Sequence, residues 1–448
     1  MAQLQPFRAF RYNPERVSFQ QVLTQPYDKI STEMQSKYYA ADPHNLITVE
    51  KGRAFPTDNP DNNVYTRASA AVNDWIQKRV LVQDPTPSFY AYSQEFPVPG
   101  TRQRATRHGF IGLAKLEEYS AGIVFRHEHT LSGPKADRLE LLRHTNTHTG
   151  QLFMLYSDPA RKIDQILLEV ETHNAPATEI RDEYDVVHRL WVISDPQRVA
   201  EIQKAMTDQK LVIADGHHRY ETALNYRNEL RSRAGKTDPD AVYENAMMTF
   251  VNTRSEGLVI LPTHRVVANL QDFSWNKMLS QLEPWFSSEV FSFSSEAEKT
   301  EARNKFLTRL TELRSQRAIG VYPTAQSAKR ALYVLSLRPG ADLTRLLPDR
   351  SALQRQLDVV LLHEGILQPL LGITPQSVAK EANLTYEREA AAALDAVDRG
   401  AAQIAFLLNP VDVEEVMTVA TTGEVMPQKS TDFFPKLMSG ITMCRLID

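Results

Sequence analysis

Cysteine is nearly absent from this 448-residue chain, in which Cys444 is the single one. One cysteine cannot form an intramolecular disulfide or a multi-cysteine metal site, and such scarcity is typical of a reducing compartment. The chain also lacks the ~20-residue apolar run that a membrane-spanning helix needs, and its first residues carry no secretory signal pattern. We therefore expect a soluble, cytoplasmic protein with no membrane partner.

An excess of positive charge is missing as well. The chain has 51 Lys and Arg against 55 Asp and Glu, which gives a net charge of −4 at pH 7. Because nucleic-acid-binding domains are usually basic, this balance argues against DNA or RNA as the partner. The Walker A, Rossmann GxGxxG, GxSxG and kinase Gly-rich patterns are also missing. We expect a small-molecule substrate, and the sequence leaves the oligomeric state open, a homodimer included.

The order of apolar segments predicts an α/β (α+β) fold with a mixed sheet. Strand-like segments at 89–96 and 108–116 flank a basic turn and predict a hairpin. A strand at 186–193, a helix at 198–206 and the strand KLVIA at 210–214 predict a βαβ-like unit.

Longer amphipathic helices prevail after about residue 262, and the longest apolar one is expected at 353–371. The change in character predicts two domains, 1–264 and 265–448. The second is expected to be a separate C-terminal α/β domain.

The densest polar cluster follows an apolar strand, in the stretch KLVIADGHHRYETAL. Gly216 permits a tight turn, after which the first amides and the dipole of the next helix form an anion site. Arg219 can hold a phosphate through two N–H groups, and Asp215 can orient a hydroxyl or bind Mg²⁺. In the alternative interpretation Asp215 caps the helix, and His217 and His218 face water.

A second polar cluster is RHEHTLSGPKADR, which contains glycine and proline and precedes a helix. Glu128 is a candidate general base, and Lys135 or Arg138 is a candidate for neutralising phosphate charge. Asp137 lies in the same stretch. The pattern fits a solvated loop equally well.

Histidine pairs in these two clusters suggest a different chemistry. His127 and His129 could join His217 or His218 around a zinc or iron ion, since imidazole is a good ligand for both. Such a centre would indicate a metal hydrolase.

Two further motifs carry candidate residues. Asp28 in QPYDKIS could be catalytic, although an aspartate in a turn is more often structural. Lys429, Ser430 and Thr431 in MPQKSTDFFPK could bind phosphate if this segment folds back onto the first domain.

Six motifs taken together resemble the uncharacterised bacterial and archaeal family known as domain of unknown function 1015. They are QPYDKIS, HEHTLSGPKADR, FMLYSDP, VIADGHHRYETAL, AFLLNPVDVEEV and MPQKSTDFFPK, in this order along nearly the whole chain. The DGHHR turn is also similar to the phosphate-binding turn of the ParB/sulfiredoxin superfamily, which includes free L-serine kinases. This second resemblance implies a ParB/sulfiredoxin-like fold for the N-terminal domain.

The resemblance to free serine kinases implies roles for the residues of the turn. The residues implied to bind the phosphoryl donor are Gly216, His217, His218 and Arg219. Asp215 would lie beside the acceptor hydroxyl, and the catalytic acid that those kinases take from an earlier segment would be Glu128 or Asp28. The resemblance therefore implies a small-molecule kinase that uses ATP, ADP or pyrophosphate with Mg²⁺ on a small hydroxyl compound.

Two rival functions stay open beside the kinase. One is a ParB-like nucleotide-binding switch that signals to another macromolecule without efficient transfer, and the other is the His-ligated metal hydrolase. Sulfiredoxin chemistry is not expected, because His217 and His218 stand where that reaction needs a cysteine. The sequence names neither the acceptor nor the donor.

Overall fold

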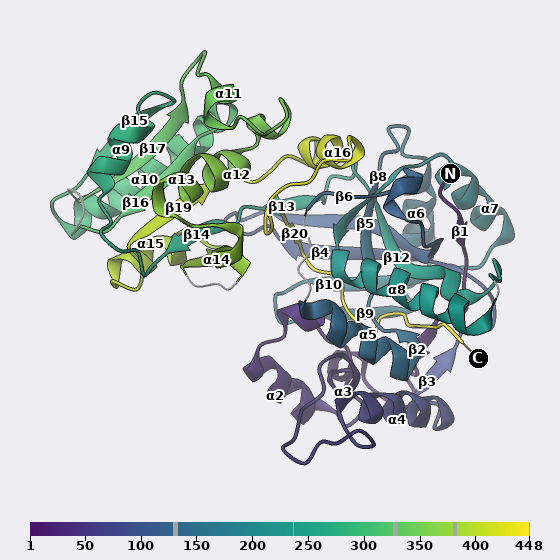
Figure 1. Ribbon diagram of the computed structural model, residues 1–448. Helices are drawn as coiled ribbons and strands as arrows, with labels where there is room; N and C mark the ends of the chain where they lie inside the picture. Colours follow the sequence, from purple (N-terminus) through teal and green to yellow (C-terminus); the bar gives the residue numbers. More distant parts are fainter. Residues whose placement is uncertain (129–132, 236, 326–329, 380–382, 448) are drawn as a thin grey trace. The chain divides into compact units, whose positions relative to one another are not determined.

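The computed structural model describes residues 1–128, 133–235, 237–325, 330–379 and 383–447. The chain forms two compact units, which can be followed by colour in Figure 1. The first comprises Met1–Arg126, Thr130–Val259 and Phe433–Asp448, and the second comprises His127–His129 and Ile260–Asp432.

The division of the chain differs from the predicted domains 1–264 and 265–448 in one main respect, because Phe433–Asp448 belongs to the first unit. Backbone pairing explains this return. Strand β21 (Cys444–Arg445) pairs with β7 (Thr147–His148), and the backbones of Phe10 and Met443 exchange two hydrogen bonds of 2.9 Å. These contacts join the C-terminal residues to the first unit.

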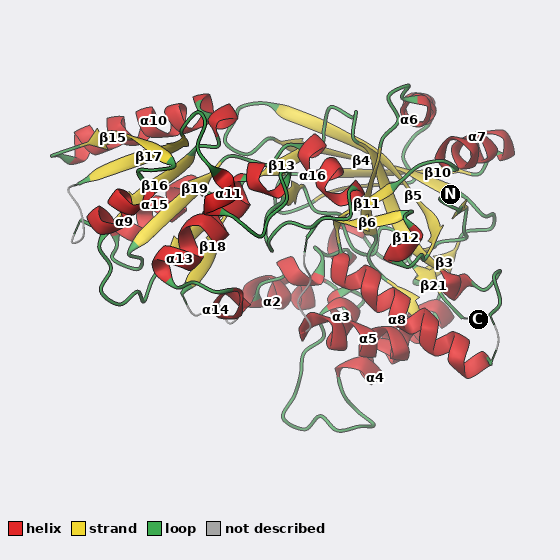
Figure 2. Cartoon of the chain, turned by 45° about the horizontal axis from the view of Figure 1, so that its top comes forward, coloured by secondary structure: helices red, strands yellow, loops and turns green. Residues whose placement is uncertain are grey.

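The first unit is built on one large sheet with helices around it, and Figure 2 distinguishes the two kinds of element. Its other strands are β1 (Leu4–Gln5), β2 (Phe10–Tyr12), β3 (Leu81–Gln83), β4 (Phe89–Pro97), β5 (Arg104–Lys115), β6 (Val124–Arg126), β8 (Leu152–Tyr156), β9 (Thr178–Arg181), β10 (Val187–Ile193), β11 (Leu211–Asp215) and β12 (Asn245–Asn252). Its helices are α1 (Phe19–Val22), α2 (Thr32–Ala41), α3 (Ile47–Glu50), α4 (Val64–Gln77), α5 (Gly133–Thr145), α6 (Lys162–His173), α7 (Pro196–Met206) and α8 (His217–Ala234), with 3₁₀ turns η1 (Tyr27–Lys29), η2 (Tyr119–Ala121) and η3 (Val242–Glu244).

The large sheet has the order β6-β11-β8-β12-β5-β4-β10-β9, and β1 also pairs with β5. Strands β6 and β11 are parallel, as are β8 and β12, while the other pairs are antiparallel. This mixed sheet confirms the predicted α/β (α+β) class. The hairpin β4–β5 is also confirmed.

The predicted βαβ-like unit has its two strands parallel in one sheet, but they are not neighbours. Strands β10 and β11, which flank helix α7 in the chain, are separated in the sheet by β8, β12, β5 and β4. Periodicity identified each element, but it carries no information on which strands become neighbours.

One face of this sheet is apolar and forms the main core. Alternate residues of its strands pack there with residues of α6, α7 and α8. Ala91, Phe110 and Phe250 are successive cross-strand neighbours on this face, and the rings of the two phenylalanines stack at 5.0 Å. Cross-strand aromatic pairs of this kind add to the stability of a sheet.

The second unit contains a smaller antiparallel sheet of order β15-β17-β16-β19-β14-β18. Its strands are β14 (His264–Val267), β15 (Phe286–Ser292), β16 (Ile319–Pro323), β17 (Ala331–Leu337), β18 (Leu384–Glu387) and β19 (Ile404–Leu408). Its helices are α9 (Trp275–Leu282), α10 (Glu296–Glu312), α11 (Leu343–Leu346), α12 (Asp358–Val360), α13 (Gln368–Leu371), α14 (Pro375–Ala379), α15 (Ala390–Asp398) and α16 (Val413–Thr421). Strands β13 (Val259–Leu261) and β20 (Asp432–Phe434) lie where the chain passes between units.

The long helix predicted at 353–371 is interrupted. A 3₁₀ turn η5 (Gln354–Gln356) precedes α12, and a π-helical segment η6 (Leu361–Leu367) separates α12 from α13. Another 3₁₀ turn, η4 (Arg314–Gln316), follows α10. Within the described residues, no helix combines the length and hydropathy needed to cross a membrane.

Candidate functional site

The DGHHR stretch forms a sharp turn between strand β11 and helix α8. Gly216 adopts φ +94°, a left-handed conformation that costs glycine little. A Cβ atom at this position would lie 3.1 Å from Leu152 Cδ2 and 3.2 Å from two nitrogens of Arg219. The glycine therefore allows the backbone to turn within contact of Arg219.

Asp215 stands at the end of β11 and lies between two cations. Its Oδ2 atom accepts a hydrogen bond from Arg219 Nη2 at 3.1 Å, and its Oδ1 atom lies 3.4 Å from Lys436 Nζ. Burial alone would raise the pKa of Asp215, but the charges of Lys436, Arg219 and Lys29 outweigh it and hold that pKa well below its usual range. The carboxyl group is therefore ionised at neutral pH.

The capping interpretation of the DGHHR stretch is not supported by this geometry. Helix α8 has Gly216 as its N-cap and begins without a side-chain cap, whereas α7 begins with Asp195 accepting from the Arg198 amide. His217 is buried, so it does not face water.

Arg219 connects the turn to the start of strand β8. Its Nη1 atom donates to the backbone oxygen of Gln151 at 2.5 Å. Burial lowers the pKa of Arg219, but the negative charges of Asp215, Asp28 and Glu50 more than compensate and raise it. The guanidinium group thus lies among Asp215 of the same turn and acids from two distant parts of the sequence.

The motif QPYDKIS supplies the 3₁₀ turn η1 and lies in this same cluster. The Asp28 charge acts on Arg219, and the Lys29 charge acts on Asp215. The ring of Tyr27 lies 4.3 Å from the Arg138 guanidinium, a favourable cation–π arrangement. Asp28 is therefore near the DGHHR turn.

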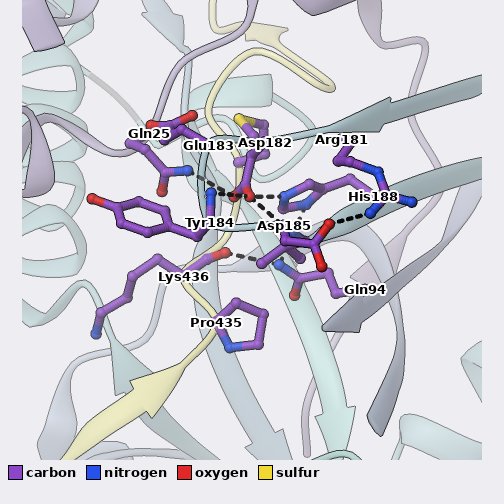
Figure 3. Close-up of polar contacts among 12 residues, drawn as sticks. Gln25, Gln94, Arg181, Asp182, Glu183, Tyr184, Asp185, His188, Pro435 and Lys436 are labelled. Atoms are coloured by element: carbon purple, nitrogen blue, oxygen red, sulfur yellow. Dashed lines mark hydrogen bonds and ion pairs between the residues drawn. The ribbon is translucent and has the colours of Figure 1, made fainter. Parts of the chain in front are cut away.

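Lys436 is held by the polar face of the large sheet. Arg107, Gln94 and His188 are successive cross-strand neighbours on β5, β4 and β10. Gln94 Nε2 donates to the Lys436 backbone oxygen at 2.8 Å, and Arg107 Nη1 donates to the Phe434 backbone oxygen at 3.2 Å. Figure 3 shows the Lys436 amine pointing away from Gln94, so the sheet holds its backbone and leaves the side chain for Asp215.

His188 and its neighbours orient Gln94 and complete this support (Figure 3). The imidazole is fully buried, with Tyr92 Oη 2.7 Å from Nδ1 and Asp182 Oδ2 3.2 Å from Nε2. Burial would raise the pKa of Asp182, but its bonds to His188, the Val186 amide and Gln25 lower it. A chain of buried polar groups therefore leads from Asp182 to the Lys436 backbone.

A small cavity of about 60 Å³ lies behind Arg219, lined by Glu50, Arg138, Thr149 and Gly150 among others. Glu50 is buried and accepts a hydrogen bond of 2.6 Å from Thr149 Oγ1. This volume suits a few water molecules but not a substrate. A larger molecule would have to approach from the outer side, where Asp215 is 26% exposed.

Lys135, Arg138 and Asp137 lie on helix α5, which packs on α8. Lys135 forms an ion pair with Glu221, a residue of α8. Arg138 Nη1 donates to the Glu50 backbone oxygen at 2.9 Å, and Asp137 accepts from Tyr65 Oη at 3.0 Å. Arg138 thus borders the cluster.

His127 and Glu128 belong to the second unit. His127 Nε2 lies 2.8 Å from Thr431 Oγ1, and the backbone of Glu128 forms a bridge with Met426. The structure does not place these residues in the unit of the DGHHR turn. His129 lies outside the described residues.

The motif MPQKSTDFFPK is divided between the units. Lys429, Ser430 and Thr431 are in the second unit, where Lys429 is exposed and Ser430 Oγ donates to the Pro427 backbone oxygen at 2.5 Å. Lys436 lies in the first unit beside Asp215. Of the two lysines in the motif, the second was missing from the predicted set.

Metal ligation finds little support among the described residues. In these parts of the chain, no three His, Cys, Asp or Glu side chains are grouped as a metal site would require. Both oxygens of Asp215 face cations, so this carboxylate does not fit the Mg²⁺ ligand that the kinase resemblance implies.

Solved structures similar to this chain include a conserved hypothetical protein from Pyrococcus furiosus, with 14% identity, 75% of this chain and 94% of that chain covered, and a TM-score of 0.34. A free serine kinase in complex with AMP has 13% identity, covers 75% and 90%, and has a TM-score of 0.35. SbnI from Staphylococcus aureus, truncated at its C-terminus, has 10% identity, covers 73% and 85%, and has a TM-score of 0.32. Likeness at this level says nothing about activity.

No curated protein matches the chain. The family model described as "Protein of unknown function (DUF1015)" matches residues 4–360, which span the QPYDKIS, HEHTLSGPKADR, FMLYSDP and VIADGHHRYETAL motifs. The two later motifs lie beyond the matched region. With most of its length matched, the chain belongs to the DUF1015 family of proteins of unknown function.

Proposed function

We propose that the first unit is a small-molecule phosphotransferase, and that the DGHHR turn with Lys436 holds the phosphoryl donor. The observation that carries this proposal is the convergence of Arg219 and Lys436, from segments over two hundred positions apart, on the carboxylate of Asp215. Phosphoryl transfer depends on positioning and on neutralising phosphate charge, which is what such a cluster of cations supplies.

The donor would bind on the outer side of the turn. There the N-terminal end of α8 carries the positive end of the helix dipole and has no acidic residue in its first turn. Phosphate oxygens would compete with Asp215 for Arg219 and Lys436. As the cations turn toward phosphate, they stabilise the ionised Asp215 carboxylate less, so its pKa rises.

This exchange gives the two aspartates different roles. Asp215 orients Arg219 and Lys436 before the donor binds. Asp28, on the separate turn η1, is the proposed base that accepts the proton of the acceptor hydroxyl as its oxygen attacks phosphorus. The leaving phosphate or nucleotide would take the charge that develops in the transition state, stabilised by Arg219 and Lys436.

The test is phosphorus NMR of the protein with L-serine and, in turn, ATP, ADP and pyrophosphate, with and without Mg²⁺. A new phosphomonoester signal would establish transfer and name the donor. Lys436→Ala should slow transfer at least about 100-fold, as expected for loss of a positioned charge in the transition state.

Lys429→Ala is the matched control, because it removes a lysine of the same motif that lies in the second unit. Equal loss in both variants would contradict the proposed role of Lys436. Donor binding without consumption would favour the nucleotide-binding switch instead. Absence of donor binding in the unsubstituted protein would overturn the proposal.

A further inference from the structure

The second unit contains a cavity far larger than the one behind Arg219. Its volume is about 610 Å³, within the range of small-molecule sites. It lies where β19 leads into α16 and is bordered by the start of α12 and the turn η4. All of its lining residues belong to this unit.

Asp358 is the most unusual group in this lining. It opens helix α12, and its Oδ1 atom is buried without a hydrogen-bond partner among the described residues. The nearest cation is Arg317, whose Nη1 atom lies 3.7 Å away, too far for a hydrogen bond. Burial raises the pKa of Asp358 to about 7.

Arg317 does not compensate Asp358 because it is already engaged. The same Nη1 atom donates to Glu415 Oε1 at 2.6 Å. Glu415 in turn forms the capping box of α16 with Asp412, which fixes its position. The Asp358 carboxyl group therefore stands in the cavity wall with an unsatisfied capacity to accept hydrogen bonds.

Positive charge lies in the same wall. Arg265 is fully buried, donates to His363 Nε2 at 3.0 Å and to the Lys429 backbone oxygen at 3.1 Å, and makes no ion pair within the described part of the chain. Arg314, which is 46% exposed, forms an ion pair with Asp412 at 3.5 Å. Arg265 is thus a buried positive charge next to the cavity, whereas Arg314 is accessible to a ligand.

The balance of charge selects the ligand class. Five carboxylates and three arginines line the cavity, so a polyanion such as a nucleotide triphosphate would meet a surplus of negative charge. A protonated amine can donate hydrogen bonds to these carboxylates, and a single carboxylate can form an ion pair with Arg314. Leu357, Val359 and Leu408 supply apolar surface for an aliphatic chain.

We propose that this cavity binds a zwitterionic amino acid, whose protonated amine pairs with Asp358 and whose carboxylate pairs with Arg314. The pairing supplies a positive charge beside Asp358, which Arg317 does not supply because it is bonded to Glu415. This site is separate from the proposed phosphotransferase site and does not depend on it.

The test is isothermal titration calorimetry of the full chain with L-lysine and L-leucine as probes. Cadaverine, which lacks the carboxylate, and 4-methylpentanoate, which lacks the amine, are the matched compounds. The amino acids should bind at least tenfold more tightly than either. Preference for ATP over both amino acids, or no binding of either at millimolar concentration, would overturn the proposal.

Two variants assign the groups. Asp358→Asn should weaken L-lysine binding at least tenfold, whereas Asp349→Asn, at an exposed position outside the lining, should not change it. Arg314→Gln should weaken L-lysine but leave cadaverine unchanged. L-lysine binding that persists in Asp358→Asn but is lost in Arg219→Ala would place the amino acid in the first unit and refute the inference.

Discussion

Asp215 in the first unit and Asp358 in the second are both largely enclosed aspartates, yet their pKa values move in opposite directions. Burial raises the pKa of each. Asp215 has Arg219 at 3.1 Å on one oxygen and Lys436 at 3.4 Å on the other, and these charges prevail. Asp358 has a single cation at 3.7 Å, which is shared with Glu415, and burial prevails.

The difference shows that burial does not decide the ionisation of a carboxyl group by itself. What decides it is the number of cations that are not already committed to another acid. In the first unit, Lys436 and Lys29 come from remote segments to act on Asp215. In the second unit, Arg317 is the cation nearest to Asp358, but it is bonded to Glu415 of the α16 capping box. One aspartate is therefore a fixed charge, while the other is able to change its protonation near neutral pH.

The strongest test of this contrast is Asp358→Asn. Because the folded pKa of Asp358 is about 7 against an ordinary value near 3.8, the folded state holds its proton more tightly than the unfolded state does. At pH 3 Asp358 is protonated in both states and does not change the free energy of unfolding. Above pH 7 its ionisation lowers the free energy of unfolding by up to about 4 kcal/mol. The variant should be more stable than the original protein at pH 8, and the gain should shrink as pH falls toward 4.

Hydrogen exchange of the β19 amides measures that effect in the second unit alone. Asp349→Asn is again the control, for which no pH-dependent gain is expected. A variant that is less stable at pH 8 would show that Asp358 is ionised and compensated after all.

The next largest effect is expected from Lys436→Ala, which removes the largest cationic contribution at Asp215. The remaining Arg219 cannot fully compensate a partly buried carboxylate, so the first unit should lose about 2–3 kcal/mol at pH 7. Because the folded pKa of Asp215 is depressed, the ion-pair contribution is present above pH 4 and is lost as pH falls through that depressed value. Hydrogen exchange of the β8 amides measures the loss. Unchanged exchange would show that the pairing of Asp215 with Lys436 does not stabilise the first unit.

A smaller change should make Asp358 resemble Asp215. Glu415→Gln removes the competing acid and leaves Arg317 to Asp358, whose pKa should then fall by about one unit, equivalent to about 1 kcal/mol. The pH at which the second unit loses stability would move down accordingly. An unchanged pH profile would mean that Arg317 does not reach Asp358.

The smallest effect is expected from Lys429→Ala. Lys429 is exposed, so its truncation should change stability by less than about 0.5 kcal/mol and leave donor binding unaltered. Urea unfolding at pH 7 would show this. A loss comparable to that of Lys436→Ala would mean that the motif acts as a whole.

The DGHHR turn could be predicted from the sequence because all of its information is local. An apolar strand, a glycine and a charged helix start are contiguous, and the structure has β11, Gly216 and α8 in that order. The side-chain roles predicted there stay predictions. Lys436 was left out of the predicted set because its proximity to Asp215 depends on cross-strand contacts of Gln94 and Arg107, which no local pattern reveals.

The position of Asp358 in a cavity wall could not be predicted from the sequence, for a different reason. The apolar pattern at 353–371 predicts one continuous helix, in which a single aspartate would be an ordinary surface residue. The 3₁₀ turn η5 and the π-helical segment η6 leave no signature in that apolar pattern. The sheet of the second unit and the position of Arg317 decide that Asp358 faces a cavity, and neither can be inferred from periodicity.

The return of Phe433–Asp448 to the first unit has a consequence for how the protein is made. Synthesis proceeds from the N-terminus, so most of the large sheet emerges from the ribosome long before β21 and Lys436 exist. Until then Arg107 and Gln94 lack the backbone oxygens that they bind in the finished protein. The polar face of the sheet is therefore completed last, and a nascent chain that stops after the second unit carries the DGHHR turn without the lysine beside it.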